Sequence, residues 1–254
     1  MSIGIKKSVL IALSLFFFTC AFASPPKFRA LVLAEPVGDH KEFVLAALSW
    51  LDTFAIENGF EFTVLDYGNG ITESVVSHYQ VIIQLNQAPY AWGDTAMAAF
   101  EKYIDEGRGG WVGFHHASLL GEFDGYPMWN WFSDFMGGIR FKNYIATKAS
   151  AMVRVEDSTN PVMKGLPPSF IIPDEEWYTF DVDPRPNVHV LANVDESSYQ
   201  PPSDIKMGDH PVIWMNEKKK AKNVYFLIGH SPSLLKSAEF KIMVGNAILW
   251  AGGK

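Results

Sequence analysis

Short apolar runs alternate with segments of helical periodicity through the first half of this chain, and this alternation strongly limits how it can fold. Residues 28–34, 79–85 and 110–114 are predominantly apolar, while residues 41–58 and 94–106 repeat apolar side chains at helical spacing. Continuously apolar strands suit a parallel sheet that is covered by helices on both faces. The order strand, helix, strand therefore predicts right-handed crossovers and a doubly wound, mostly parallel α/β sheet.

The second half of the chain is less regular, and its strands are harder to place. Residues 149–156, 188–194, 212–216 and 224–228 are predicted to be strands, and residues 237–250 a final helix. We find neither an internal repeat nor a linker-like segment. A single domain with an irregular second half is therefore expected.

The N-terminus has the pattern of a secretory signal peptide. Lys6 and Lys7 precede an apolar run too short to span a bilayer comfortably, and an Ala-x-Ala motif ends at Ala23. We expect residues 1–23 to be removed, which leaves a soluble periplasmic or extracellular protein. A lipid anchor on Cys20 is the less favoured alternative, because the residues before this cysteine are a poor lipoprotein signal.

Residues 24–254 are expected to form a single α/β domain, and their composition excludes several classes of function. Cys20 is the only cysteine, so the mature protein would hold no disulfide and no thiol nucleophile. The formal charge is −7, and loss of Lys6 and Lys7 would make it −9. An acidic chain without a basic stripe is not expected to bind nucleic acid or anionic membrane, and no transmembrane segment follows the signal peptide.

Proton-active side chains gather in the loops that follow predicted strands. His115 and His116 follow the central strand, and Asp39–His40, Asp174–Glu176 and Gly229–His230 hold comparable positions. Ligands of open α/β sheets bind outside the carboxyl ends of the strands, where such loops converge. Each loop histidine alone is more often solvated or structural, so the prediction of a site depends on the recurrence.

Two further features bear on this edge. His115 lies between Gly113 and Ala117 in the spacing of a nucleophile elbow, with histidine in the nucleophile position. Asp209–His210 precedes a strand, and in a parallel sheet it would lie at the opposite end. The competing interpretation is a buried strand whose terminal histidines bond only to backbone.

The residues leave acid–base chemistry as the favoured mechanism. Ser118 and Ser231 lack the Gly-x-Ser-x-Gly context of a serine nucleophile. His115 or His230, paired with a carboxylate, can take up and return a proton near neutral pH.

A metal site is the alternative that the same loops allow. His40, His115 or His230 together with Glu175 would give a histidine and carboxylate site for a divalent ion such as zinc. No local metal-binding motif supports it, because these residues are far apart in the sequence.

Five motifs in order resemble the ThuA-like (trehalose-utilisation) family over nearly the whole mature chain. They are Val112–His115, Asn160–Pro167, Asp174–Tyr178, Pro211–Trp214 and Val224–His230. The chain departs from the family pattern at Asn160, where His is frequent, and after Gly137–Gly138, where no histidine follows Phe141.

The resemblance implies a flavodoxin-like fold similar to class I glutamine amidotransferases, with the catalytic cysteine replaced. It also implies a role in sugar metabolism, on a disaccharide or keto-sugar. Glutamine amidotransfer is excluded because the mature chain would have no cysteine. Two hypotheses follow: a hydrolase or isomerase that acts on a small-molecule carbohydrate, or a non-catalytic sugar- or partner-binding module. The predicted catalytic residues are His115, His230, Glu175 and Glu176. The predicted substrate-binding residues are His40, His116, Trp92, Trp129, Trp177 and Tyr178.

The most specific expectation concerns geometry. His115 and His230 should line one pocket together with Glu175 or Glu176, with His40 at the rim. A separation of more than roughly 12 Å, several times hydrogen-bond reach, would exclude a shared site.

Overall fold

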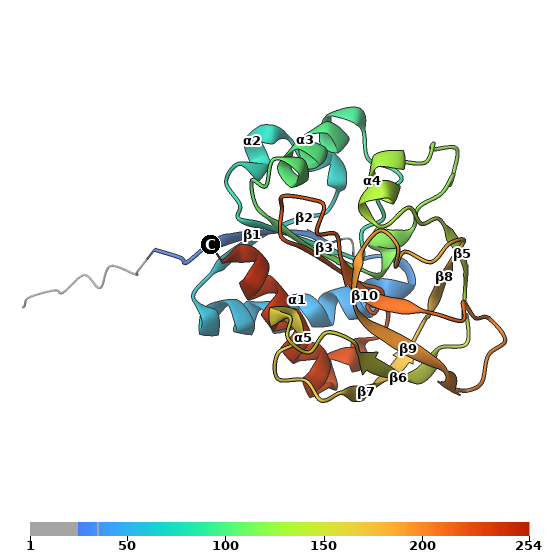
Figure 1. Ribbon diagram of the computed structural model, residues 1–254. Helices are drawn as coiled ribbons and strands as arrows, with labels where there is room; N and C mark the ends of the chain where they lie inside the picture. The colour runs from blue at the N-terminus through green and yellow to red at the C-terminus, as the bar shows by residue number, and fades with distance from the viewer. Residues whose placement is uncertain (1–24, 35, 254) are drawn as a thin grey trace, which may run out of the picture.

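The computed structural model describes residues 25–34 and 36–253, and its centre is one large mixed sheet (Figure 1). Within these residues the sheet has nine strands in the order β2-β1-β3-β4-β11-β10-β9-β6-β7. The first five strands run parallel to one another. They are β2 (Glu61–Leu65), β1 (Arg29–Ala34), β3 (Val81–Leu85), β4 (Gly110–Phe114) and β11 (Asn223–Phe226).

The parallel strands have the order of a flavodoxin-like sheet, so the predicted α/β fold class is confirmed. Every residue of β3, β4 and β11 is buried, as are the last five of β1, which explains their continuously apolar sequences. The chain reverses its winding between β1 and β3. Ligand sites of such folds lie outside the strand ends next to this reversal.

Helices cover both faces of the sheet. α1 (Lys41–Asn58) and α5 (Ala238–Gly252) lie on one face; α2 (Glu73–Val76), α3 (Asp94–Asp105) and α4 (Asn130–Phe135) lie on the other (Figure 1). α1 has the predicted bounds because Gly59 follows it in the left-handed conformation, at φ +73°. The Ser237 side chain accepts a hydrogen bond from the Phe240 N–H and so caps α5, the predicted final helix.

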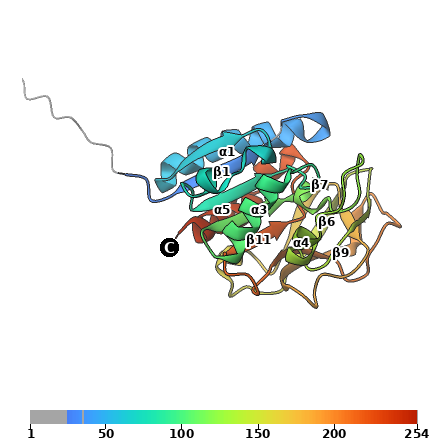
Figure 2. The ribbon, with the colours of Figure 1, turned by 90° about the horizontal axis from the view of Figure 1, so that it is seen from above.

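Four antiparallel strands extend the sheet beyond β11: β10 (Pro211–Met215), β9 (His189–Gln200), β6 (Ala149–Val155) and β7 (Ser169–Glu175). Figure 2 shows β6, β7 and β9 at one side of the molecule, with α1, α3 and α5 towards the other. β5 (Phe141–Tyr144) and β8 (Tyr178–Phe180) form a separate two-stranded sheet. The described part of the chain also contains five 3-10 turns: η1 (Gly38–His40), η2 (Gly68–Gly70), η3 (His115–Ser118), η4 (Pro161–Met163) and η5 (Pro232–Lys236).

Three expectations for the second half are wrong. The acidic segment is not wholly a loop, because Asp174 and Glu175 end β7. β9 extends beyond the predicted residue 194 to Gln200. Since β10 runs antiparallel to β11, Asp209–His210 lies at the same edge as the carboxyl ends of the parallel strands and not at the opposite one. Strand direction is not encoded in the periodicity of a fully buried strand, which is why it was not predicted.

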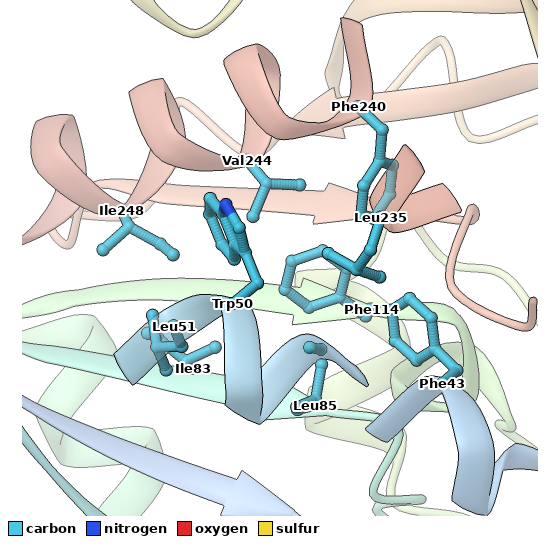
Figure 3. Close-up of a pocket in the computed structure, with 11 residues that line it drawn as sticks. Phe43, Trp50, Leu51, Ile83, Leu85, Phe114, Leu235, Phe240, Val244 and Ile248 are labelled. Atoms are coloured by element: carbon cyan, nitrogen blue, oxygen red, sulfur yellow. The ribbon is translucent and has the colours of Figure 1, made fainter. Parts of the chain in front are cut away.

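A small cavity lies between α1 and α5, on the face of the sheet that they cover (Figure 3). It holds about 20 Å³ and is lined by apolar side chains, among them Phe43, Trp50, Phe114 and Val244. A volume close to that of one water, with no polar partner for it, is typical of a packing gap. The cavity is therefore not a candidate for a polar active site.

Among the described residues, none of the helices combines the length and the apolar character needed to cross a bilayer. The predicted signal peptide, residues 1–23 with Cys20, lies outside the described residues.

Candidate functional site

Four histidines meet where the parallel strands end. His40 is the last residue of η1, which follows β1; His115 and His116 open η3, directly after β4; and His230 follows β11. The ring centroids of His115 and His230 are 5.6 Å apart, and His40 lies 4.4 Å from His230 and 3.9 Å from His116. The structure thus brings the predicted histidines into one cluster, well within the expected 12 Å.

The backbone at His115 is unusual. Its φ of +39° lies in the left-handed region, which costs a side chain with a Cβ on the order of 1–2 kcal/mol. Two hydroxyl groups approach this turn: Tyr225 and Ser118 both donate to the His115 carbonyl, at 3.0 and 2.9 Å. The turn directs the ring into the cluster, as a nucleophile elbow directs its side chain.

Close approach of two strand ends explains the glycine before His230. A Cβ added to Gly229 would lie 3.1 Å from the Cβ of His115 and 3.3 Å from that of Phe114. Any larger residue would push the end of β11 away from the end of β4. Gly229 therefore keeps His115 and His230 within reach of each other.

Glu176 is the carboxylate that faces the histidines. Its Oε2 lies 3.4 Å from Nε2 of His115, 3.3 Å from Nδ1 of His230 and 4.0 Å from Nε2 of His40. Nδ1 of His230 and Nε2 of His40 are 2.9 Å apart. One donor atom from each of these four residues falls within 4.8 Å of all the others.

These separations fit a single metal ion. Four ligand atoms about 2.1 Å from zinc in a tetrahedron lie about 3.4 Å apart, close to most of the observed values. Three imidazole nitrogens and one carboxylate oxygen form a donor set that suits zinc and similar transition metals better than Mg²⁺ or Ca²⁺. The carboxylate is Glu176 and not the Glu175 of the sequence-based hypothesis.

The tautomer of His115 strengthens this fit. Nδ1 of His115 lies 2.8 Å from the Leu227 carbonyl oxygen, which can only accept, so Nδ1 carries a proton. Nε2 of a neutral ring then presents a lone pair to a carboxylate oxygen of Glu176. Two acceptors at this distance need a cation between them, either a proton or a metal ion.

Glu175 has a different position from its neighbour. Its fully buried carboxyl group accepts hydrogen bonds from the backbone N–H groups of Glu176, Gly229 and His230, at 3.0, 3.1 and 3.1 Å. Its Oε1 lies 3.7 Å from Nδ1 of His115. Glu175 therefore connects the end of β7 to the turn that carries His230.

Burial determines the ionisation of the cluster. Burial lowers the pKa of His40 to about 2 and that of His116 to about 3, with further lowering from neighbouring histidines, and burial also lowers the pKa of His115. Burial raises the pKa of Glu175 to about 8, although the three N–H groups favour its charged form. Burial also opposes ionisation of Glu176, but the neighbouring His115 and His230 outweigh it and hold its pKa below the usual range. Neutral imidazoles beside an ionised carboxylate are the protonation states that metal ligation requires.

His116 and Tyr178 lie beside the four residues that could hold an ion, but neither is one of them. The His116 ring packs against His40, and the Tyr178 ring lies 4.0 Å from His115. The side chains of His40 and Glu176 are 12% and 13% exposed, so solvent reaches the cluster on their side.

The three tryptophans predicted to bind substrate are core residues. Trp92 and Trp129 pack 5.5 Å apart beside Phe100 of α3, and Trp177 donates its Nε1–H to the Ala149 carbonyl oxygen. All three are buried, with at most 6% exposed. Full burial leaves no ring face on which a sugar can stack, so these side chains are not placed for the substrate binding that the sequence suggested.

Asn86 is a residue of this edge that the sequence analysis missed. It follows β3 with φ +56°, and its Nδ2 donates to the Gly229 carbonyl oxygen at 2.6 Å. Its buried Oδ1 and the buried Nε2 of His230 have no hydrogen-bond partner among the described residues. The signal that could have found it is its place directly after a buried strand, since Asn tolerates the left-handed conformation.

A second buried pair lies at the same edge. His210 contacts Glu196 through Nδ1 at 2.9 Å and the Tyr178 carbonyl oxygen through Nε2 at 2.8 Å. This hydrogen bond fixes the backbone of Tyr178, and so holds in place the ring that packs on His115.

Comparison with known families places the chain in one of them. The sequence model of the ThuA family, described as trehalose utilisation, matches residues 29–251. The chain belongs to the ThuA family. That assignment confirms the resemblance inferred from the five sequence motifs, and all four clustered histidines fall inside the matched region.

Solved structures of other ThuA-like proteins share the fold. A putative ThuA-like protein from Bacteroides uniformis is 28% identical, with a TM-score of 0.80, over 92% of this chain and 95% of that one. A putative ThuA-like protein from Parabacteroides merdae is 15% identical, with a TM-score of 0.68, over 89% and 90% of the two chains. A cytoplasmic protein from Salmonella typhimurium shares the fold at 11% identity and a TM-score of 0.58, over 81% and 87%. A comparison with curated proteins found no significant match.

Proposed function

We propose that this ThuA-family protein is an enzyme of carbohydrate metabolism, and that His40, His115, Glu176 and His230 hold a divalent transition metal ion such as zinc at its active site. The observation that carries the proposal is the convergence of four donor atoms within 4.8 Å at the carboxyl edge of the sheet. The family description, trehalose utilisation, supports a carbohydrate substrate.

The chain's own residues account for most of the proposed chemistry. When bound, the ion supplies Lewis-acid polarisation of a substrate oxygen. His40 and His115 are neutral and Glu176 is ionised at neutral pH, so these three residues need not lose a proton before they bind the ion. Solvent access beside His40 and Glu176 marks the side from which a substrate enters.

His116 is placed beside the proposed ligands as a proton acceptor, because burial lowers its pKa to about 3 and leaves the ring neutral near pH 7. Its ring packs 3.9 Å from His40 but is not one of the four proposed ligands, so its nitrogens are not committed to the ion. Tyr178 closes the site beside His115. Hydrolysis and isomerisation both require such a proton acceptor.

The test combines metal analysis with a substrate screen. Purified protein is expected to contain about one equivalent of metal, and removal of the metal by a chelator should abolish turnover of disaccharides or keto-sugars. His115→Ala should lose both metal and turnover, whereas the surface variant Tyr67→Ala should keep both. Turnover that survives complete metal removal would favour metal-free acid–base catalysis by the His115 and Glu176 pair. Sugar binding without any turnover would favour the binding-module hypothesis.

We also propose that the protein is exported, because residues 1–23 have the charge, apolar run and cleavage motif of a signal peptide. The intact mass of protein recovered from the native host tests this. A mature chain that begins at Ser24 is expected, and retention of Cys20 with a lipid adduct would contradict it.

A further inference from the structure

A continuous series of aromatic rings leads from the histidine cluster to the surface. Tyr178, which packs on His115, lies 5.0 Å from Phe141 and 6.3 Å from Tyr144. Phe141 lies 6.3 Å from Phe123, and Phe123 lies 5.2 Å from Tyr90, which in turn lies 6.2 Å from Tyr126. We call these residues the aromatic strip: Tyr90, Phe123, Tyr126, Phe141, Tyr144 and Tyr178.

Exposure increases along the aromatic strip. Tyr178 is 3% exposed beside the cluster, whereas Tyr144 and Tyr126 are 40% and 47% exposed. The strip therefore begins inside the site and ends on the surface. The sheet of β5 and β8, which carries Phe141, Tyr144 and Tyr178, lies at the right-hand side of the molecule in Figure 1.

The local backbone holds these rings in place. Asp124 and Gly125 have φ values of +52° and +83°, and the Tyr126 N–H donates to the Phe123 carbonyl oxygen at 2.8 Å. Two positive φ values in a two-residue turn are typical of a tight hairpin, which fixes Phe123 and Tyr126 relative to each other. A register shift in β5 between Phe141 and Asn143 brings Phe141 and Tyr144 close to the same Tyr178 ring.

We propose that the aromatic strip binds an extended carbohydrate, an oligosaccharide whose terminal unit lies at the histidine cluster. This inference rests on the proposed function, because it makes the strip the continuation of that site. Tyr178 is too buried to offer a ring face to a sugar, but it contacts both His115 and Phe141, so the exposed rings of the strip are connected to the histidine cluster. Rings with fixed positions and polar tips lose little entropy when they bind a ligand that is itself amphipathic.

Neighbouring side chains favour a sugar over a protein or a charged ligand. Exposed Glu122 and Asp124 adjoin Phe123, and exposed Lys142 and Asn143 lie between Phe141 and Tyr144. These side chains offer both donors and acceptors to the hydroxyl groups of a sugar. Because they include both negative and positive charges, they favour neither an anionic nor a cationic ligand. They also divide the exposed rings into small areas, unlike the contiguous apolar patch typical of a protein interface.

The test measures how affinity depends on ligand length. Calorimetry with malto-, cello- and xylo-oligosaccharides of one to six units is expected to show affinity that rises with length for at least one series. Tyr126→Ala and Tyr144→Ala should each weaken binding of the longest ligand by about two- to tenfold and leave the monosaccharide unaffected. Tyr67→Ala, at a tyrosine that is 67% exposed on the loop after β2, is the matched control and should change neither.

The outcomes separate this proposal from the function on which it rests. Affinity that is independent of length in all three series, or equal in Tyr126→Ala and wild type, overturns the strip even if metal and turnover are present. Length-dependent binding that Tyr126→Ala weakens supports the strip even if no metal is found. Dimers in light scattering that Tyr126→Ala and Tyr144→Ala dissociate would show that a second copy of the chain occupies the strip, and would also overturn it.

Discussion

Alanine variants of His40 and His116 distinguish a proposed metal ligand from a neighbouring histidine that is not one. The two rings pack 3.9 Å apart and both are largely withdrawn from solvent, but only His40 has a nitrogen in the group of four. His40→Ala should abolish most of the stabilisation by zinc, whereas His116→Ala should retain it. Loss of imidazole burial is common to both variants, so only the metal response distinguishes them.

The size of the effect follows from mass action. Zinc at 100 times its Kd stabilises the folded state by about 2.7 kcal/mol, which raises the Tm of a domain of this size by about 5–11 °C. Loss of a direct ligand should raise the Kd at least about 100-fold, the upper end of what loss of an indirect partner costs. At the same zinc concentration the stabilisation then falls to about 0.4 kcal/mol, or about 1–2 °C.

The assay is differential scanning fluorimetry of wild type and both variants, with zinc and with excess chelator. A wild-type Tm that zinc leaves unchanged would refute the metal site. Equal loss of the zinc response in His40→Ala and His116→Ala would show that the response reports general packing of the cluster and not ligation by His40.

Three further predictions concern the supports of the site. Gly229→Ala should destabilise the fold by about 1–3 kcal/mol and weaken zinc binding without removing a ligand, because the added Cβ would lie 3.1 Å from the Cβ of His115. Urea unfolding measures the stability and calorimetry the zinc affinity, and an unchanged zinc affinity would contradict the prediction. His115→Gly should be more stable than His115→Ala in urea unfolding, because φ is +39°; the usual order, with alanine more stable, would show that this turn is unstrained. Burial opposes ionisation of Glu196, but hydrogen bonds from His210 and two backbone N–H groups hold its pKa below the usual 4.5. A carboxyl group whose pKa is lower in the folded than in the unfolded protein stabilises the fold above the unfolded-state pKa, and this stabilisation is lost as the pH falls through the folded-state pKa. Wild type should therefore lose stability below about pH 4.5 more steeply than Glu196→Gln. Urea midpoints of the two proteins that run parallel from pH 3 to 7 would contradict this.

Periodicity was sufficient to predict the parallel half of the fold and the edge where the histidines meet. The bounds of α1 and β4 could be predicted because an apolar period ends at Gly59 in one case and at His115 in the other. β5 could not be predicted, because its sequence, FKNY, is short, polar and largely exposed. The direction of β10 could not be predicted either, since PVIWM is fully buried and a buried strand has the same apolar pattern in either direction.

The roles of Glu175 and Glu176 show where sequence reasoning ends, and they give the last prediction. The two residues are adjacent and chemically identical, but β7 ends at Glu175, whose carboxyl group binds three backbone N–H groups, whereas Glu176 beyond it faces the histidines. Glu175→Ala leaves three N–H groups without their partner in a fully buried place. At about 1–3 kcal/mol for each buried donor that finds no water, it should destabilise the metal-free protein by at least about 3 kcal/mol.

Glu176→Ala removes a partly exposed side chain that holds no backbone group in place. It should destabilise the metal-free protein less than Glu175→Ala does and abolish the zinc-dependent rise in Tm. Urea unfolding in chelator and fluorimetry with zinc measure the two effects separately. If Glu175→Ala left the metal-free stability unchanged, or Glu176→Ala kept the full zinc response, the division of roles between the two carboxyl groups would be wrong. A clean separation would show that the end of a strand, and not residue type, decides which of two neighbouring glutamates supports the fold and which one faces the ligand.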